Sequence, residues 1–208
     1  MKTKSVLIAG GAGFIGSHLT ERLIAKKYRV TVADNLSRGA WENIAHLKNH
    51  LRFLKLDLRT ETAALFATKN QDIVFNLAAL NTGIDYDAGR TQKMFEENML
   101  LQMIPLRAAA ANRVKTFIQI SSASIYSRKT MEARKPIKEI EDRGDPEPSK
   151  LGYALAKRMG ENLARWYAAS SSMNTVIARF INVYGAKDHF DDLGHFIPQF
   201  SGRQVVRR

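Results

Sequence analysis

A glycine-rich segment near the start of the chain constrains the fold more than any other feature. Residues Gly10–Gly16 (GGAGFIG) carry four glycines and separate a short apolar run, Ser5–Ala9, from a helical pattern, Phe14–Lys26. Glycines at a turn from strand to helix let backbone N–H groups approach a pyrophosphate, which then lies at the positive end of the helix. A glycine motif alone also fits a merely flexible turn, but this flanking pattern predicts dinucleotide binding.

An acidic residue supports this interpretation. A second predicted strand, Tyr28–Ala33, leads into Asp34, which follows Gly16 by 18 residues. A carboxylate about 20 residues after the glycines can accept hydrogen bonds from ribose hydroxyls. The same charge repels a 2′-phosphate, so Asp34 favours NAD over NADP, although the neighbouring Arg38 would soften this preference.

The rest of the chain continues the alternation of strand and helix. Further strands are predicted at Leu51–Leu56, Asp72–Leu77, Thr116–Ile120 and Thr175–Phe180, and further helices at Trp41–Asn49, Glu61–Thr68, Thr91–Asn112 and Gly152–Ser170. This alternation predicts an α/β fold with a doubly wound parallel sheet, the Rossmann fold. We expect this domain to occupy residues 1–184. Residues 185–208 would begin a C-terminal substrate-binding lobe, and Lys129–Lys150 would form a surface loop or lid.

Composition excludes several classes of protein. With 208 residues, 45% of them hydrophobic, the chain can bury one core, and its lack of cysteine excludes disulfides, thiolate metal sites and a cysteine nucleophile. Neither a signal peptide nor a membrane-spanning run is apparent. We therefore expect a cytoplasmic protein without a membrane segment, and no metal site is predicted.

The net charge of +12, from 32 Lys and Arg against 20 Asp and Glu, indicates an anionic partner. Apart from clusters in the 128–138 region and at the C-terminus, the basic residues are scattered, and no base-stacking motif accompanies them. Nucleic acid is therefore the less favoured partner.

A tyrosine and a lysine four residues apart open the last long helical pattern. Tyr153 and Lys157 share one helix face at this spacing. A free phenol has a pKa of about 10, and an adjacent ammonium group favours the phenolate, which suits the tyrosine to acid–base work. The fifth strand ends in Ser121–Tyr126 (SSASIY), where hydroxyls would face a ligand crevice. Taken singly, these patterns also occur on exposed helix faces and in loop caps.

Together the motifs resemble the extended short-chain dehydrogenase/reductases, in the NAD-dependent epimerase/dehydratase family that modifies nucleotide sugars. The resemblance runs from Val6 to about Phe200. It rests on GGAGFIGSHL, DNLSRG, Asp57-Leu58, Asn76-Leu77-Ala78-Ala79, SSASIY, Tyr153-x-x-x-Lys157 and the RFINVYG segment that begins at Arg179.

The resemblance implies a role for each matching residue. Tyr153 would be the acid–base, Lys157 would hold the nicotinamide ribose, and Ser122 would assist. Asn182 and Ser122 would contact a UDP-, GDP- or dTDP-linked sugar. The implied contacts of the NAD cofactor, besides Tyr153 and Lys157, are Gly10, Gly13, Phe14, Ile15, Gly16, Asp34, Asn35, Ser37, Arg38, Asp57, Leu58, Leu77, Ala78, Ala79 and Asn98.

Two further residues bear on the type of reaction. Family dehydratases and decarboxylases usually carry an acidic residue two positions before Tyr126, where this chain has Ser124, so the resemblance disfavours elimination. The segments 81–84 and 188–198 resemble instead the GDP-fucose synthase and GDP-mannose 3,5-epimerase branches. In fucose synthases a histidine and a cysteine form the epimerising pair, and His195 and Ser124 stand at those positions. Both are candidate catalytic residues, although an alcohol is a much weaker acid than a thiol.

Three hypotheses about function remain open from the sequence. The first is an enzyme that transiently oxidises a sugar hydroxyl and so allows epimerisation, reduction or oxidation. The second is a non-catalytic dinucleotide-binding remnant, since family members continue into a substrate lobe and this chain stops at Arg208 as if truncated or shifted in reading frame. The third is a basic nucleic-acid-binding protein on the same fold. The family resemblance further suggests a homodimer formed through the helices Thr91–Asn112 and Gly152–Ser170.

Overall fold

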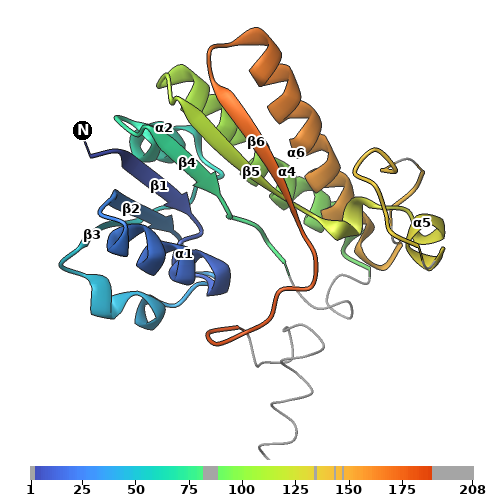
Figure 1. Ribbon diagram of the computed structural model, residues 1–208, viewed down its shortest axis with the longest axis horizontal. Helices are drawn as coiled ribbons and strands as arrows, with labels where there is room; N and C mark the ends of the chain where they lie inside the picture. Colours follow the sequence, from blue (N-terminus) through green and yellow to red (C-terminus); the bar gives the residue numbers. More distant parts are fainter. Residues whose placement is uncertain (1–2, 82–88, 134, 143, 147, 189–208) are drawn as a thin grey trace, which may run out of the picture.

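The computed structural model, which describes residues 3–81, 89–133, 135–142, 144–146 and 148–188, confirms the doubly wound α/β fold (Figure 1). One sheet has the strand order β3-β2-β1-β4-β5-β6, and every neighbouring pair is parallel. Its strands are β1 (Ser5–Ala9), β2 (Arg29–Asp34), β3 (Leu51–Lys55), β4 (Ile73–Asn76), β5 (Thr116–Ser122) and β6 (Asn174–Phe180).

The long helices cover both faces of this sheet. They are α1 (Phe14–Ala25), α2 (Glu61–Thr68), α4 (Thr91–Ala111) and α6 (Leu151–Ser170), each within one residue of its predicted bounds. Helix α1 lies on one face, and α2, α4 and α6 lie on the other (Figure 1). This arrangement places the carboxyl ends of β1 and β4, where the strand order reverses, at the mouth of a crevice.

Strand β1 shows why its sequence has no polar residue after its first position. Val6 and Ile8 pack into the core beneath α1, whereas Leu7 and Ala9 pack into the core beneath α2 and α4. Successive strand residues point to opposite faces, so a strand covered on both sides needs apolar side chains at consecutive positions. The central strand therefore joins two hydrophobic cores.

One predicted helix is wrong. In place of a helix at Trp41–Asn49, the chain forms two short 3-10 turns, η1 (Trp41–Asn43) and η2 (Ala45–Leu47). The Asn43 side chain donates to the carbonyl of Ala12 at 2.9 Å, and the Trp41 ring packs against Phe53 with centroids 5.0 Å apart. These contacts hold the segment against the glycine turn and β3 and override its helical pattern.

The predicted loop Lys129–Lys150 also contains short helices. These are α5 (Arg128–Glu132) and η4 (Pro148–Lys150), and η3 (Ala123–Ile125) precedes them. Ser127 begins α5 by accepting a hydrogen bond from the backbone of Thr130 at 3.1 Å. Regular structure in the described part of this connection is limited to these short helices and an isolated bridge between Ser127 and Pro146. We call residues 123–150 the connecting segment, because it joins β5 to α6.

After β6 the chain turns back toward α1. His18 Nε2 lies 2.9 Å from the Ala186 carbonyl, and Lys187 Nζ contacts the carboxylate of Glu21 and the carbonyl of Asn43. Residues 181–188 thus lie against the Rossmann unit, and the rest of the predicted lobe, 189–208, lies outside the described residues. Every helix that the structure describes is too short or too polar to cross a bilayer.

Candidate functional site

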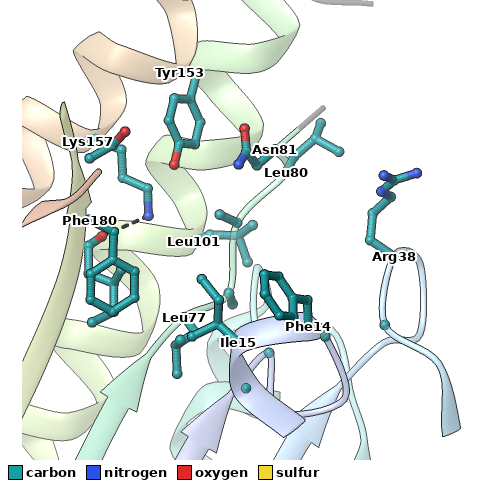
Figure 2. Close-up of a pocket in the computed structure, with 18 of the residues that line it drawn as sticks. Phe14, Ile15, Arg38, Leu77, Leu80, Asn81, Leu101, Tyr153, Lys157 and Phe180 are labelled. Atoms are coloured by element: carbon teal, nitrogen blue, oxygen red, sulfur yellow. Dashed lines mark hydrogen bonds between the residues drawn. The ribbon is translucent and has the colours of Figure 1, made fainter. Parts of the chain in front are cut away.

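A cavity of about 990 Å³ opens at the carboxyl ends of the strands. Its wall draws on the glycine turn, the end of β2, the loop after β4, the end of β5, the start of α6 and the segment after β6. Figure 2 shows Tyr153 and Lys157 at one side of this cavity, Phe14 and Ile15 below them, and Arg38 at the opposite end. The cavity therefore gathers segments that are far apart in sequence.

The glycine turn is packed so tightly that side chains are excluded at two positions. Gly10 has a φ of +75°, and a Cβ there would lie 2.9 Å from the backbone nitrogen of Ala78. A Cβ on Gly16 would lie 2.2 Å from the carbonyl oxygen of Gly10. The glycines thus let the loops after β1 and β4 meet, and they leave the N-terminus of α1 open to the cavity.

Asp34 lies at the end of β2 with its carboxylate against this turn. Its Oδ2 accepts a hydrogen bond from the backbone of Ala12 at 3.0 Å, and its Oδ1 accepts one from Leu36 at 2.9 Å. A Cβ on Gly39 would come within 2.9 Å of both oxygens. Burial raises the pKa of Asp34, and the two backbone hydrogen bonds oppose that rise. The backbone fixes the carboxylate, whose remaining lone pairs are suited to hydroxyl donors.

A second acidic group borders the same end of the cavity. Arg59 Nε donates to Asp57 Oδ1 at 2.9 Å, and Arg59 also pairs with Glu97 of α4. The hydrogen bond from Arg59 lowers the pKa of Asp57 to about 2. Arg59 and Glu97 line the cavity but were not predicted as site residues, because nothing in the sequence links positions 38 residues apart.

Tyr153 and Lys157 occupy the opposite side, on the first turns of α6. The Lys157 ammonium is buried, donates to the carbonyl of Ile120 at 2.8 Å and lies 5.7 Å from the centre of the Tyr153 ring. Burial lowers the pKa of Lys157 to about 7. The Nζ of Lys150 lies 5.9 Å from the centre of the same ring. Two lysines thus surround the phenol, and either ammonium would stabilise a phenolate.

The end of β5 presents paired hydroxyls to the cavity. Ser122 Oγ donates to Ser124 Oγ at 3.1 Å and accepts a hydrogen bond from the Ser124 backbone at 3.2 Å. This local cap orients Ser122 and shapes η3. The capping role and a role toward a ligand are compatible, because a hydroxyl has one donor and two acceptor sites.

The structure brings nearly all the predicted site residues around one cavity. Those that line the cavity are Gly10, Gly13, Phe14, Ile15, Gly16, Asp34, Asn35, Ser37, Arg38, Asp57, Leu58, Leu77, Ala78, Ala79, Ser122, Ser124, Tyr153, Lys157 and Asn182. Asn98 lies behind the wall, where its amide bonds to the backbone N–H and carbonyl of Leu80 and to the carbonyl of Met94. His195 lies outside the described residues.

Several lining residues carry no motif of their own. Lys93, Lys150 and Leu101 reach the cavity through the packing of α4 and α6. Lys150 sits three positions before Tyr153, so its place beside the phenol could have been inferred from helical spacing. Within the described part of the chain, no group of three or more His, Asp or Glu side chains could hold a metal ion.

Comparison with known proteins gives consistent results. Residues 6–207 match the profile of a family described as the NAD dependent epimerase/dehydratase family. The chain is 30% identical over 199 residues to the UDP-N-acetyl-alpha-D-glucosaminuronate decarboxylase of Bacillus cytotoxicus, a match covering 95% of this chain and 60% of that protein. It is 32% identical over 184 residues to GDP-mannose 3,5-epimerase 1 of Oryza sativa subsp. indica, which covers 86% of this chain and 47% of that protein.

A solved structure shows the same arrangement. The UDP-N-acetylglucosamine 4-epimerase of Methanobrevibacter ruminantium M1, in complex with UDP-N-acetylmuramic acid, superposes with a TM-score of 0.86 at 30% identity. That match covers 100% of this chain and 64% of the other. The chain thus spans less than two thirds of the length of each of these relatives.

Proposed function

Since the chain belongs to the NAD dependent epimerase/dehydratase family, we propose that it supplies the cofactor-binding and catalytic half of an NAD-dependent enzyme that modifies a nucleotide sugar. The reaction would oxidise a sugar hydroxyl transiently, and its further course would give epimerisation or reduction. The observation that carries the proposal is the single cavity that holds the glycine turn, Asp34, Ser122, Tyr153 and Lys157 together.

The cavity residues fit NAD. Gly10, Gly13 and Gly16 line the cavity where α1 begins, and the first N–H groups of that helix would bind a pyrophosphate there. The carboxylate of Asp34 faces the same end of the cavity and suits ribose hydroxyls. Lys157, at the other end, would hold the nicotinamide ribose. When bound, NAD⁺ supplies a hydride acceptor.

Side chains of the protein would then carry out the proton transfer. Tyr153 would take the proton of the sugar hydroxyl as phenolate, and the ammonium groups of Lys150 and Lys157, each under 6 Å from the centre of the ring, would stabilise that phenolate. Ser122 would donate a hydrogen bond to the same sugar oxygen and so hold it toward the phenol. Asn182, on the wall after β6, would contact the sugar.

The substrate proposed is a sugar linked to UDP, GDP or dTDP. Support comes from the relatives, whose names specify UDP-linked and GDP-linked sugars. Ser124 in place of an acidic residue supports epimerisation or reduction over elimination, although a decarboxylase is among the relatives. The cytoplasmic location and the catalytic role of His195 stay predictions.

We also propose that the protein forms a homodimer through α4 and α6. The two helices pack together on one face of the sheet (Figure 1). Leu100 of α4 and Met159 and Trp166 of α6 leave apolar surface exposed there. Met159 and Trp166 are seven residues apart and therefore share a face of α6.

The test of the proposed chemistry is the change Tyr153→Phe. It removes the acid–base group but no predicted cofactor charge, so NAD affinity measured by calorimetry should change less than about threefold, well under 1 kcal/mol. The rate at which UDP- and GDP-sugars are converted with NAD⁺ present, measured by chromatography of the sugar products, should fall by about a hundredfold or more, as expected for loss of a general base. Tyr167→Phe, on the same helix but outside the cavity wall, is the matched control.

Retained turnover in Tyr153→Phe would contradict the assignment. A wild-type chain that binds NAD but no nucleotide sugar would favour the alternative, a cofactor-binding unit that lacks a substrate site.

A further inference from the structure

A buried carboxylate lies directly behind the proposed catalytic pair. Glu161 follows Tyr153 and Lys157 on α6 at intervals of four, so the three share one side of the helix. Its side chain is fully buried and accepts hydrogen bonds from Arg179 Nε at 2.8 Å and Nη2 at 2.7 Å. Arg165 Nη2 contacts the same carboxylate at 2.9 Å. Burial raises the pKa of Glu161, but hydrogen bonds from Arg179 and Ser121 and the charges of Arg179 and Arg165 outweigh it, and the pKa is lowered overall.

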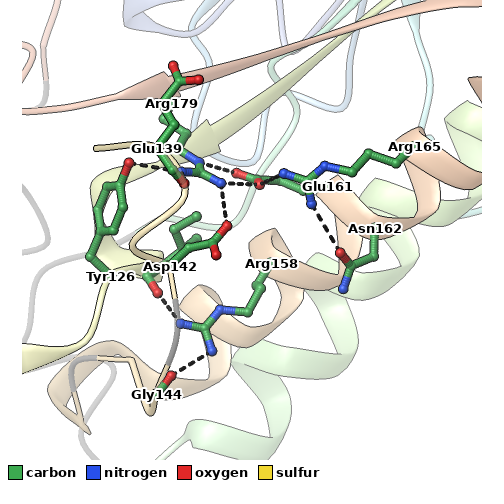
Figure 3. Close-up of polar contacts among 10 residues, drawn as sticks. Tyr126, Glu139, Asp142, Gly144, Arg158, Glu161, Asn162, Arg165 and Arg179 are labelled. Carbon is green, nitrogen blue, oxygen red and sulfur yellow. Dashed lines mark hydrogen bonds and ion pairs between the residues drawn. The ribbon is translucent and has the colours of Figure 1, made fainter. Parts of the chain in front are cut away.

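Arg179 links the buried carboxylate of Glu161 to the connecting segment. It lies on β6 opposite Ser121 of β5, one position before the partner of Ser122. Its guanidinium donates to the Tyr126 hydroxyl at 2.9 Å, to the carbonyl of Glu139 and to Asp142 Oδ2 at 2.7 Å (Figure 3). The guanidinium of Arg179 therefore binds acceptors on α6 and at three positions of the connecting segment.

A second arginine ties the same segment to α6. Arg158 Nη1 donates to the carbonyl of Gly144 at 2.8 Å, and its Nη2 donates to the carbonyl of Ile125 (Figure 3). The connecting segment follows Ser122 and runs to the residues just before Tyr153. The connecting segment therefore joins Ser122 to Tyr153 along the chain, and its conformation affects how these two residues are placed relative to each other.

We propose that Glu161 and Arg179 are positioning residues, which fix the connecting segment against α6 and thereby set how Ser122 and Tyr153 face each other. This inference rests on the proposed function, since it takes Tyr153 as the acid–base. Stability alone does not account for the pair, because apolar residues of similar volume often replace a buried ion pair without loss. A forked guanidinium instead holds several acceptors in fixed directions, which apolar contacts do not.

The experiment removes the pair without changing the net charge. In the double variant Glu161→Leu, Arg179→Met, a negative and a positive group are lost together, so distant electrostatics stay balanced. The readout is the ultraviolet titration of the Tyr153 phenol in the full chain, obtained by subtracting the same background carrying Tyr153→Phe. Lys150 and Lys157 are the charged groups placed at the ring. NAD affinity and the melting temperature are measured in parallel.

Because the amino groups of Lys150 and Lys157 lie at the ring, we expect the wild-type phenol to titrate below the free value of about 10 and the double variant to move back up toward it by about one pH unit or more. NAD affinity should stay within about twofold, a change under 0.5 kcal/mol. Arg165→Met is the matched control, because Arg165 binds the same carboxylate but no residue of the connecting segment in the described contacts. It should leave the titration unchanged.

A second variant keeps the test decisive if the first does not fold. Tyr126→Phe with Asp142→Ala removes the two side-chain acceptors of Arg179 in the connecting segment, so that only the Glu139 carbonyl remains there, and it leaves Glu161 paired. It should shift the titration in the same direction. A wild-type midpoint already at the free-phenol value, or variants that lose melting temperature but keep the wild-type midpoint, would overturn the proposal. The titration needs no sugar, so failure of the proposed reaction would appear separately. It would appear as a wild-type chain whose Tyr153 midpoint is shifted and depends on Glu161 and Arg179 but which converts no nucleotide sugar.

Discussion

At the scale of single residues, the site depends on a lysine whose surroundings make its charge unfavourable. The Lys157 side chain is buried, and the carbonyl of Ile120 accepts its hydrogen bond. Burial lowers its pKa to about 7, so near neutral pH the group is divided between charged and neutral forms. An anionic neighbour would stabilise the charged form of this lysine, and the phenolate of Tyr153 would provide one.

This lysine makes stability depend on pH. Its pKa is about 7 in the folded chain and 10.5 when unperturbed, so between these values the unfolded chain binds more protons. The free energy of unfolding of the wild-type chain, relative to Lys157→Met, should therefore rise with pH from about 7 to 10.5 and be flat below 7. The slope is at most about 1.4 kcal/mol per pH unit. Urea unfolding of both proteins across this range measures it, and a difference independent of pH would refute the burial argument.

Residue types with local spacing were predictable, and pairs distant in sequence were not. Tyr153 and Lys157 are recognised by their interval of four, but the burial that sets the lysine pKa depends on Ile120 of another strand. Arg179 belonged to a recognised motif, yet its pairing with Glu161 spans 18 residues and two elements. Charged residues in a helix and a strand usually face solvent, so sequence alone gave no reason to pair them.

At the scale of elements, the strand–turn–helix unit was predictable because its signals are local. Helix α1 begins at Phe14 directly after Gly13, as expected, and β2 ends at Asp34. The prediction of a helix at residues 41–49 was wrong because the contacts that decide the conformation of this segment are not local. Its conformation follows from bonds that Asn43 and Trp41 make with the glycine turn and β3, and the helical pattern contains no trace of those contacts.

Two glycines of this unit should respond differently to alanine. A Cβ on Gly16 would lie 2.2 Å from the Gly10 carbonyl, and both groups belong to the backbone, so we expect Gly16→Ala to lower the free energy of unfolding by about 3 kcal/mol or more. At Gly13 the nearest atom is 3.4 Å away and φ is −74°, so Gly13→Ala should cost about 1 kcal/mol or less.

The affinity for NAD separates packing from binding at these positions. Gly13 caps α1 and lines the cavity, so Gly13→Ala should weaken NAD binding by about tenfold, or 1.4 kcal/mol, while the fold persists. Denaturant unfolding and calorimetry of each variant give the two quantities. Equal loss of stability in both variants would show that the turn yields more readily than its backbone contacts indicate.

At the scale of the whole molecule, the sheet separates two kinds of surface. The carboxyl ends of its strands form the cavity, while α4 and α6 cover one face and turn their outer sides to solvent. The Trp166 side chain is 59% exposed, and Leu100 and Met159 are each more than a third exposed. Both helices already bury one face against the sheet, so periodicity in the sequence could not reveal whether a second face is apolar.

These exposed side chains make the proposed dimer testable by one substitution. Trp166→Glu places a charge on the exposed side of α6, and burial of an unpaired charge would oppose association strongly. We expect the wild-type chain to sediment as a dimer and the variant as a monomer with an unchanged melting temperature, because Trp166 is exposed within one chain. Ile140→Glu is the control, since Ile140 is 78% exposed but lies on the connecting segment. A wild-type chain that stays monomeric at all concentrations, or a Trp166→Glu variant that still dimerises, would place the association elsewhere than on α4 and α6.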